Sequence, residues 1–513
     1  LDNFKLILYS SAILCIIFLI KNILIILYHY FELSLRKNII YSISTRTYNN
    51  YLKTDYLFHK NNNPATLLNN IISKSNRAAN FIFFIILSVK EILLLFFLLL
   101  TILLLNFKIS FSVFCLLFIF SLAIYLLVKK KLRNIGKQTI KLEEGILKTL
   151  NQGLGGFKTL KVLGRFTFFL NDFKSLQNKR LGLDVKHRLI SMIPRFTLEV
   201  LSISSISLIC IFLLIEQNNL AMILPTITFL SLVIIRMVPS FVSLSIGFQN
   251  LKFSSSGFEE KSDEILDLEN KLKDEYDNID FSSEIKKLSI KNISFKFDNS
   301  KNILNKINLD LQIGDYVGIV GKTGSGKSTL IDIILGLLVP NSGEVLFDKI
   351  NINKNFYKIR KKIGYVPQEI YLSDDSLLNN IAYGLNKNEI DFNKVESSII
   401  KSQLKEFVET LPNKIHTVVG DRGARLSGGQ KQRIGIARAL YNDPSIIIMD
   451  ESTSSLDEYT EDKIIQDVKK LSENKIVIFV THKESALRFC NKIFEIKNGN
   501  CEFKGDFKEF KSK

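Results

Sequence analysis

The amino-acid sequence predicts two unlike parts, an all-α transmembrane domain followed by an α/β domain. Two observations predict this division. Five apolar runs, each near the roughly 20 residues that cross a bilayer as a helix, lie in the first half of the chain, and a glycine-rich loop between a strand pattern and a helix pattern lies in the second. We expect a transmembrane domain over 1–257, a linker helix over 258–285 and the α/β domain over 286–513.

The apolar runs are expected to be membrane-spanning helices. They cover about Leu6–Tyr28, Phe81–Leu105, Ser110–Val128, Leu189–Ile215 and Met222–Leu244. The segments after the first and third runs are rich in lysine and arginine, whereas the two short connections on the opposite side hold one lysine between them. Because basic loops stay on the cytoplasmic side of a membrane, we expect the long segments and the α/β domain to be cytoplasmic.

The formal net charge of +18 is explained largely by these basic segments. Basic loops at a membrane surface face anionic lipid, so the charge does not require nucleic acid, and we expect no nucleic-acid partner. The five cysteines have no paired or metal-like spacing. We therefore expect neither disulfide bonds nor a zinc site.

The glycine-rich segment has the complete pattern of a phosphate-binding loop. It reads Gly321-Lys322-Thr323-Gly324-Ser325-Gly326-Lys327-Ser328-Thr329. Its glycines let backbone N–H groups approach the phosphates, Lys327 reaches the β and γ oxygens, and Ser328 offers a hydroxyl to Mg²⁺. The apolar residues 316–320 predict a strand before the loop, and 329–338 predict a helix whose positive end faces the anion. The sequence thus predicts an α/β P-loop NTPase domain that binds ATP and Mg²⁺.

A second motif, Leu426-Ser427-Gly428-Gly429-Gln430, begins another predicted helix, and its N–H groups also suit a phosphate. With this motif the chain resembles the ATP-binding cassette (ABC) family. The resemblance implies that the motif, called the signature here, closes over the γ-phosphate held by a second cassette. It therefore implies two half-transporters per molecule. We expect a homodimer, and a heterodimer with a related half stays open.

The resemblance also assigns a hydrolytic set in family order over about 220 residues of the chain. Glu451 would polarise the attacking water, His482 would contact the γ-phosphate, and Gln368 would sense the metal. Ser328, Gln368 and Asp450 would hold Mg²⁺. Because both Glu451 and His482 are present, the resemblance implies an ATP hydrolase coupled to transport.

Two further residues complete the nucleotide site that the resemblance implies. Phe297 stands where the family usually has a tyrosine that stacks on adenine, and its aromatic face is sufficient for stacking. Asp457 lies in the loop that would meet its counterpart across the dimer.

The fusion of both parts in one chain and the long cytoplasmic segments resemble ABC exporters. In these proteins short coupling helices contact the cassettes, and our candidates are Tyr56 to Asn63 and Gln152 to Lys158. The family has six spans before the cassette, so we expect a further span upstream of Leu1. The expected location is a bacterial inner membrane with the cassette in the cytoplasm.

Three basic residues lie inside the expected spans, namely Lys21, Arg195 and Arg236. A charge at the bilayer centre costs about 2.5 to 3.5 kcal/mol and therefore commonly faces a cavity. Three such groups suit an anionic head group such as pyrophosphate. For Lys21 and Arg195, snorkelling or pairing of Arg195 with Glu199 is an equal alternative.

Shorter motifs resemble the PglK-type branch of bacterial exporters. They lie at Tyr51–Asn61 with Asn63-Pro-Ala65, Phe157–Arg165 and Arg236–Ser240. This resemblance implies that polyprenyl-pyrophosphate-linked oligosaccharides are flipped across the membrane by alternating access. An exporter of a peptide, a drug or another lipid is the main alternative, and an ATP-gated channel or regulator is a second. The five spans disfavour a soluble cassette protein that acts on nucleic acid or ribosomes.

Overall fold

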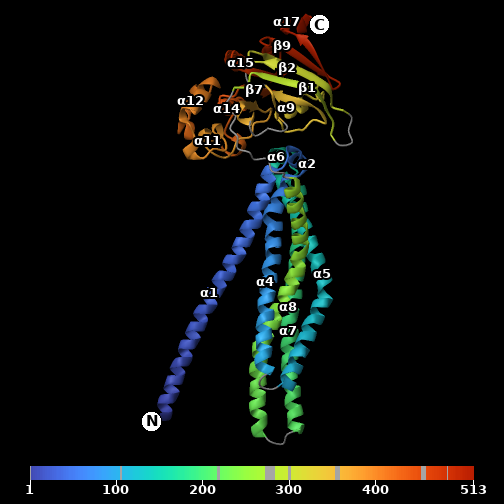
Figure 1. Cartoon of the computed structure of the whole chain (residues 1–513), viewed down its shortest axis with the longest axis vertical. Helices are drawn as coiled ribbons and strands as arrows, with labels where there is room; N and C mark the ends of the chain where they lie inside the picture. The colour runs from blue at the N-terminus through green and yellow to red at the C-terminus, as the bar shows by residue number, and fades with distance from the viewer. Residues whose placement is uncertain are drawn as a thin grey trace. The chain divides into compact units, whose positions relative to one another are not determined.

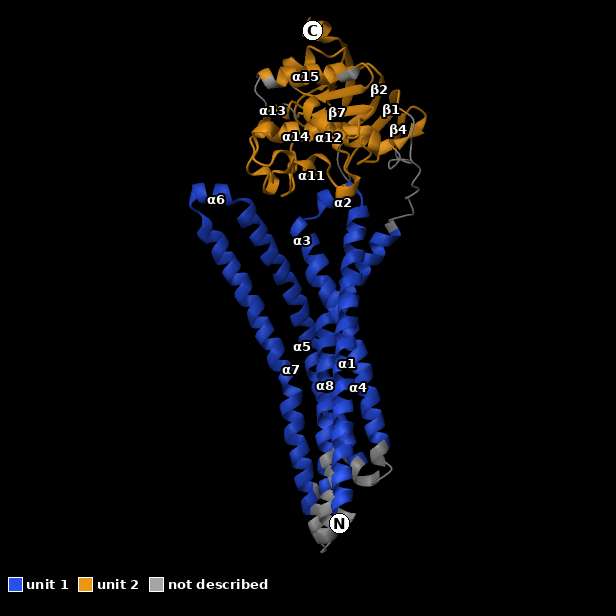
Figure 2. Cartoon of the chain, turned by 90° about the vertical axis from the view of Figure 1, so that its left-hand side faces the viewer, with its two compact units in different colours: residues 1–274 blue, residues 275–513 orange. Residues whose placement is uncertain are grey.

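The computed structural model describes residues 2–103, 107–216, 220–271, 284–297, 302–352, 359–451, 458–481 and 483–512. The chain forms two compact units, 1–274 and 275–513 (Figure 2). The division falls inside the segment 258–285 that was expected to be a linker.

The first unit is built from long helices. Four of the five expected spans fall wholly within one of these helices, and the span expected over Phe81–Leu105 does so up to Leu103, because its last two residues lie outside the described residues. These helices are α1 (Asp2–Lys53), α4 (Ser75–Leu103), α5 (Phe107–Gly155), α7 (Phe166–Glu216) and α8 (Leu220–Lys271). Within the described residues, three stretches are long and apolar enough to cross a membrane: Phe4–Lys53, Pro64–Leu100 and Phe166–Leu208. At 1.5 Å per residue, helix α5 is about 74 Å long, more than twice the thickness of a bilayer's hydrocarbon core. The helices therefore continue well beyond the apolar runs.

Helices α4, α5, α7 and α8 contact one another, and α1 diverges from them toward the N terminus (Figure 1). Their shared core includes the fully buried Leu117, Leu198, Met237 and Phe241. The large apolar side chains in the first half of α1 are exposed. The bundle therefore has a packed interior that α1 joins only through its C-terminal half.

Short helices connect the long ones at the end of the bundle opposite the N terminus (Figures 1 and 2). They are α2 (Tyr56–Asn61), α3 (Pro64–Asn69), the π-helical turn η1 (Asn70–Lys74) and α6 (Phe157–Leu163). Helix α2 covers most of the first candidate coupling segment, and α6 begins inside the second. Helix α6 ends at Gly164, whose φ of 64° gives the left-handed cap that glycine favours.

A buried polar network ties α1 and η1 to the end of α8. The Lys261 side chain is 1% exposed, and its Nζ lies 2.8 Å from Glu264 Oε2. The hydroxyl of Tyr51 donates to Glu264 Oε1, and Asn70 Nδ2 donates to the same oxygen at 2.8 Å. Nearby, Arg46 donates two hydrogen bonds to Glu269, at 2.6 and 2.7 Å. Glu264 thus has cationic and neutral donors from three elements.

The second unit contains two sheets. An antiparallel sheet has the strand order β2-β1-β4-β5, and a six-stranded sheet has the order β10-β9-β3-β8-β7-β6. The first consists of β1 (Lys287–Phe295), β2 (Leu304–Gln312), β4 (Ser342–Phe347) and β5 (Ile350–Asn351). The second consists of β3 (Tyr316–Val320), β6 (Ile363–Val366), β7 (Ile446–Asp450), β8 (Ile476–Val480), β9 (Lys492–Lys497) and β10 (Asn500–Gly505).

The central strands β3, β7 and β8 are continuous apolar runs because helices cover both faces of a parallel sheet. All five residues of β3 and of β8 are buried. The strand expected over 316–320 is confirmed, and the helix expected after the loop is α9 (Lys327–Ile334). The other α-helices in the described part of this unit are α11 (Leu377–Ile381), α12 (Phe392–Lys401), α13 (Lys405–Thr410), α14 (Gly428–Leu440), α15 (Glu458–Ser472), α16 (Glu484–Leu487) and α17 (Phe507–Ser512).

Candidate ATP-binding and hydrolysis site

The sheet gathers the expected site residues at one edge. Strands β3, β8, β7 and β6 are parallel neighbours, so their carboxyl ends meet at the same edge. Gly321 follows β3, Glu451 follows β7, and Gln368 lies two residues beyond the end of β6. The sheet therefore brings together the phosphate loop, the carboxylates of Asp450 and Glu451, and Gln368 from distant parts of the sequence.

The loop has backbone geometry that requires glycine. Gly324 and Gly326 have φ values of 79° and 107°. Gly321 has a φ of 151°, and a Cβ there would lie 2.3 Å from the carbonyl oxygen of Ile496. Side chains at these positions would strain the loop or clash with strand β9. The backbone can therefore present its N–H groups at close range.

Lys327, the first residue of α9, turns its ammonium group into the loop. Its Nζ donates to the carbonyl oxygens of Gly321 at 2.5 Å and Lys322 at 3.1 Å. Burial lowers the pKa of Lys327, and the carboxylates of Glu451 and Asp450 oppose this shift. The Ser325 hydroxyl is buried and has no hydrogen-bond partner within the described residues. Both groups fit a loop that encloses phosphate oxygens.

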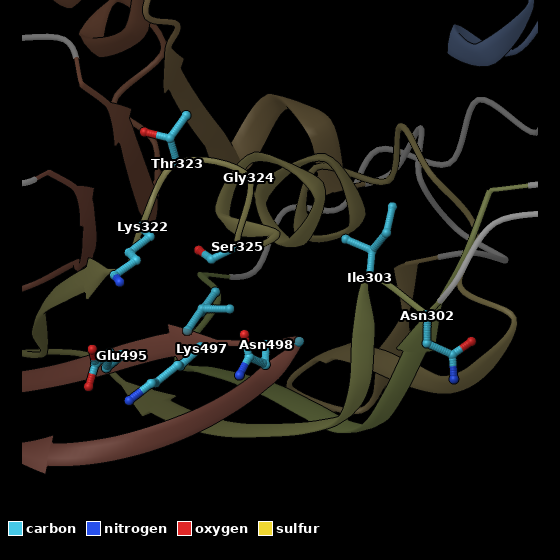
Figure 3. A pocket seen from close by; sticks show the side chains of 11 residues that line it. Asn302, Ile303, Lys322, Thr323, Gly324, Ser325, Glu495, Lys497 and Asn498 are labelled. Atoms are coloured by element: carbon cyan, nitrogen blue, oxygen red, sulfur yellow. The ribbon is translucent and has the colours of Figure 1, made fainter.

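A cavity of about 670 Å³ lies beside the loop. Figure 3 shows Lys322, Thr323 and Ser325 on one side of it, facing Lys497, the last residue of β9, and Asn498 in the turn that follows. It is lined by 302–303, 322–325 and 495–499. The segments 302–303 and 495–499 were missed from the sequence, because Asn498-Gly499 indicates a hairpin turn but not its place beside the loop. Phe297 does not line this cavity and instead contacts the ring of Phe295 edge-on, at 5.0 Å between centroids.

Two of the residues expected to act in hydrolysis, Gln368 and Glu451, are in direct contact. Gln368 Nε2 donates to Glu451 Oε2 at 2.7 Å. Glu451 has a φ of 44°, a left-handed conformation that is costly for a residue with a Cβ. Its backbone N–H nevertheless donates to the carbonyl of Val480 at 2.9 Å. The sheet thus fixes Glu451 in an unusual conformation that turns it toward Gln368.

Asp450 is partly buried and lies near other carboxylates. Burial, reinforced by the carboxylates of Glu451 and Asp332, raises its pKa to about 6. A divalent cation relieves such repulsion and prefers oxygen ligands. The oxygens of Asp450, Gln368 and Ser328 are of the type that Mg²⁺ prefers as ligands.

The signature residues cap their own helix. Ser427 Oγ accepts a hydrogen bond from the Gln430 N–H at 3.2 Å, and Gln430 Oε1 accepts one from the Ser427 N–H at 2.9 Å. This capping box places Gly428 and Gly429 in the first turn of α14. Between the described residues of the signature and those of the phosphate loop, the structure shows no hydrogen bond.

The remaining expected residues lie either outside the described residues or on the long helices of the first unit. His482 and Asp457 lie outside the described residues. Lys21, Arg195 and Arg236 lie on α1, α7 and α8, and all three are exposed. Lys21 lies over the ring of Phe18, and Arg195 Nε pairs with Glu199 at 3.3 Å. In the described part of the chain, no hydrogen bond or ion pair links these three residues to one another.

Comparison with known proteins agrees with this geometry. Residues 304–454 match the profile of the ABC transporter family. The second unit is an ABC transporter ATP-binding domain. The fold is also similar to that of a solved bacterial Atm1-family ABC exporter with ATP bound, at a TM-score of 0.79 and 18% identity, over 93% of this chain and 83% of that one. The expected order of a helical membrane-type domain and an ABC cassette is confirmed.

Curated relatives match different shares of the chain. The chain is 35% identical over 244 residues to an uncharacterised ABC transporter ATP-binding protein of Bacillus subtilis, covering 47% of this chain and 42% of the relative. It is 36% identical over 223 residues to an ATP-dependent lipid A-core flippase of Francisella novicida, covering 43% and 37%. A heterocyst differentiation ATP-binding protein of Nostoc matches over 79% of this chain and 67% of its own length, at 28% identity. The chain thus spans less than half the length of the first two.

Proposed function

We propose that this chain is one half of an ATP-driven ABC exporter. The hydrogen bond between Gln368 and Glu451, at the sheet edge that also holds Lys327, carries this proposal. This hydrogen bond joins the Gln368 amide, which can bind a metal through its oxygen, to the Glu451 carboxylate, which can accept a proton. Neither group is needed for binding nucleotide alone.

The residues perform phosphoryl transfer to water by position and charge. Lys327 and the loop N–H groups neutralise the charge that develops on the phosphoryl oxygens. Ser328, Gln368 and Asp450 would hold Mg²⁺, which would supply further neutralisation of the phosphate charge. Glu451 orients the attacking water, and His482 contacts the γ-phosphate. Phe297 stacks on adenine.

A second cassette completes each site in this proposal. The signature residues Ser427, Gly428, Gly429 and Gln430 form the start of α14 and make no hydrogen bond to the described phosphate loop of their own chain. A dimer would place them over the nucleotide of the other copy, with Asp457 in the loop at the interface. We expect two identical chains.

The transported substrate is proposed to be a lipid-linked anion that crosses the inner membrane, with the cassette in the cytoplasm. Two relatives, from Francisella novicida and Coxiella burnetii, are ATP-dependent lipid A-core flippases, at 36% and 39% identity over the matched region. Arg236 lies within an apolar helix, where an unpaired charge favours an anionic ligand. Our specific proposal is a polyprenyl-pyrophosphate oligosaccharide, recognised by Arg236 with Lys21 and Arg195.

The cycle is alternating access. ATP can drive it only if ATP binds the closed cassette pair more tightly than the open one, because only differential affinity shifts an equilibrium. Hydrolysis at Glu451 then resets the open state.

Transport is tested in proteoliposomes with and without a polyprenyl-pyrophosphate oligosaccharide. We expect the glycolipid to stimulate ATP hydrolysis, Arg236→Ala to remove the stimulation but keep basal hydrolysis, and Arg236→Lys to retain part of it. Glu451→Gln is the inactive control. Basal hydrolysis that is indifferent to this lipid would contradict the glycolipid and direct the search to peptides and drugs.

A further inference from the structure

The last turn of α14 carries an arginine with an unusual set of partners. Arg438 donates from Nε to the carbonyl oxygen of Asn380 at 2.8 Å and from Nη1 to that of Tyr371 at 2.9 Å. Its Nη2 donates to Asn380 Oδ1 at 3.3 Å, and its guanidinium lies 4.7 Å from the centroid of the Tyr383 ring. In the part of the chain that the structure describes, no carboxylate pairs with it. Arg438 therefore works as a many-donor crosslink to the backbone and not as half of an ion pair.

The backbone that Arg438 holds is itself well ordered by Asn380. This residue is fully buried, and its side chain bonds to the backbone of Ser373 and Ser376 at 3.0 and 3.1 Å. The contact at Asn380 therefore fixes the whole turn that precedes α11.

The same segment is held on α14 at a second position. Ile370 packs directly on Gly435, where a Cβ would lie 2.4 Å from the Ile370 Cδ1 atom. Ile370 and Tyr371 follow Gln368 closely in the chain, and Gln368 is bonded to Glu451. At its N-terminal end, α14 is capped by the signature residue Ser427. One helix thus connects the signature to the segment that carries Gln368.

We propose that Arg438 is a positioning residue that makes α14 and the segment 368–380 move as one piece. Binding of the other copy's γ-phosphate at the start of α14 would then hold Gln368 in contact with Glu451 in the chain's own site. This role rests on the proposed function, because it concerns how the two sites of an ATP-hydrolysing pair are linked.

The test compares Arg438→Met and Arg438→Lys with the unchanged full chain. The number of ATP-binding sites is titrated first, and kcat is expressed per binding site. We expect the ATP Kd to stay within about twofold, whereas kcat per site falls by about tenfold or more in Arg438→Met, because small misplacements of catalytic groups are costly. Arg438→Lys keeps the charge but cannot reach all three acceptors. Its kcat per site should therefore lie between those of the unchanged chain and Arg438→Met.

Arg433→Met is the matched control. Arg433 lies on the same helix and donates from Nη1 to a backbone carbonyl at 2.8 Å, but that carbonyl belongs to Gln403 and not to the Gln368 segment. We expect its kcat per site to stay within about twofold of the unchanged chain. Hydrogen exchange of the amides in 369–376 gives a readout that does not depend on turnover, and we expect faster exchange in Arg438→Met but not in Arg433→Met.

The outcomes separate the two proposals. If the unchanged chain hydrolyses ATP no faster than Glu451→Gln, the proposed function falls and this role falls with it. If the unchanged chain is active and Arg438→Met keeps full kcat per site, only the role of Arg438 is overturned. A loss of binding sites with unchanged kcat per site also overturns it, because Arg438 would then serve folding alone.

Discussion

At the residue scale, the phosphate loop was predictable because its chemistry is local. Three glycines, Lys327 and Ser328 are adjacent in sequence, and the structure gives the glycines the positive φ values that the pattern implies. The contact of Gly321 with Ile496 was not predictable, because strand β9 lies far along the chain. The sequence around Asn498 does not indicate that this residue lines the cavity, because its place there depends on tertiary contacts.

Gly324 and Gly321 provide a matched pair for testing the geometry of the phosphate loop. Gly324→Ala meets open space and should cost only the left-handed conformation, about 1 to 2 kcal/mol. Gly321→Ala should cost more, because its Cβ would lie 2.3 Å from the backbone oxygen of Ile496. The measurement is thermal unfolding together with ATP affinity. Equal losses for both variants would contradict the close approach of β9 to the loop.

At the element scale, the apolar runs predicted the positions of the long helices but not their lengths. The run over Leu189–Ile215 lies inside α7, which begins at Phe166. The polar segments continue the same helices because neighbouring helices bury one of their faces, as the buried Leu132 and Ile135 of α5 show. A hydropathy window detects the membrane portion only. Conversely, the strand over 316–320 was predicted correctly because a buried parallel strand is apolar throughout.

The polar network at the end of α8 yields a stability prediction. Glu264→Leu removes the partner of Lys261 and leaves an ammonium group that is 1% exposed without its counter-charge. Breaking a buried pair in this way costs about 3 to 5 kcal/mol. Burial already lowers the pKa of Lys261, and Glu264 opposes that shift. We expect a clear fall in the melting temperature of the detergent-solubilised chain.

Glu259→Leu serves as its control. Glu259 pairs with Arg133 on the surface at 2.6 Å, and both side chains are more than half exposed. Exposed pairs contribute about 0 to 1 kcal/mol. A melting temperature that falls as far for Glu259→Leu as for Glu264→Leu would contradict the importance of the buried network.

At the scale of the whole molecule, the fold and the cassette follow from the sequence, whereas the substrate does not. The phosphate loop, Gln368 and Glu451 are predictable because they follow buried parallel strands that end at one edge of the sheet. A transport cavity has no such constraint, and the three basic residues Lys21, Arg195 and Arg236 lie exposed on separate helices. Their role depends on what surrounds them in the assembled transporter.

The most direct test of the central claim is ATP turnover by the purified full chain beside its Glu451→Gln variant. We predict that both bind ATP with similar affinity, that the unchanged chain releases phosphate in a Mg²⁺-dependent reaction, and that Glu451→Gln loses at least about 100-fold in kcat. Equal phosphate release by the two proteins, or ATP binding without hydrolysis by the unchanged chain, would contradict an ATP-driven exporter.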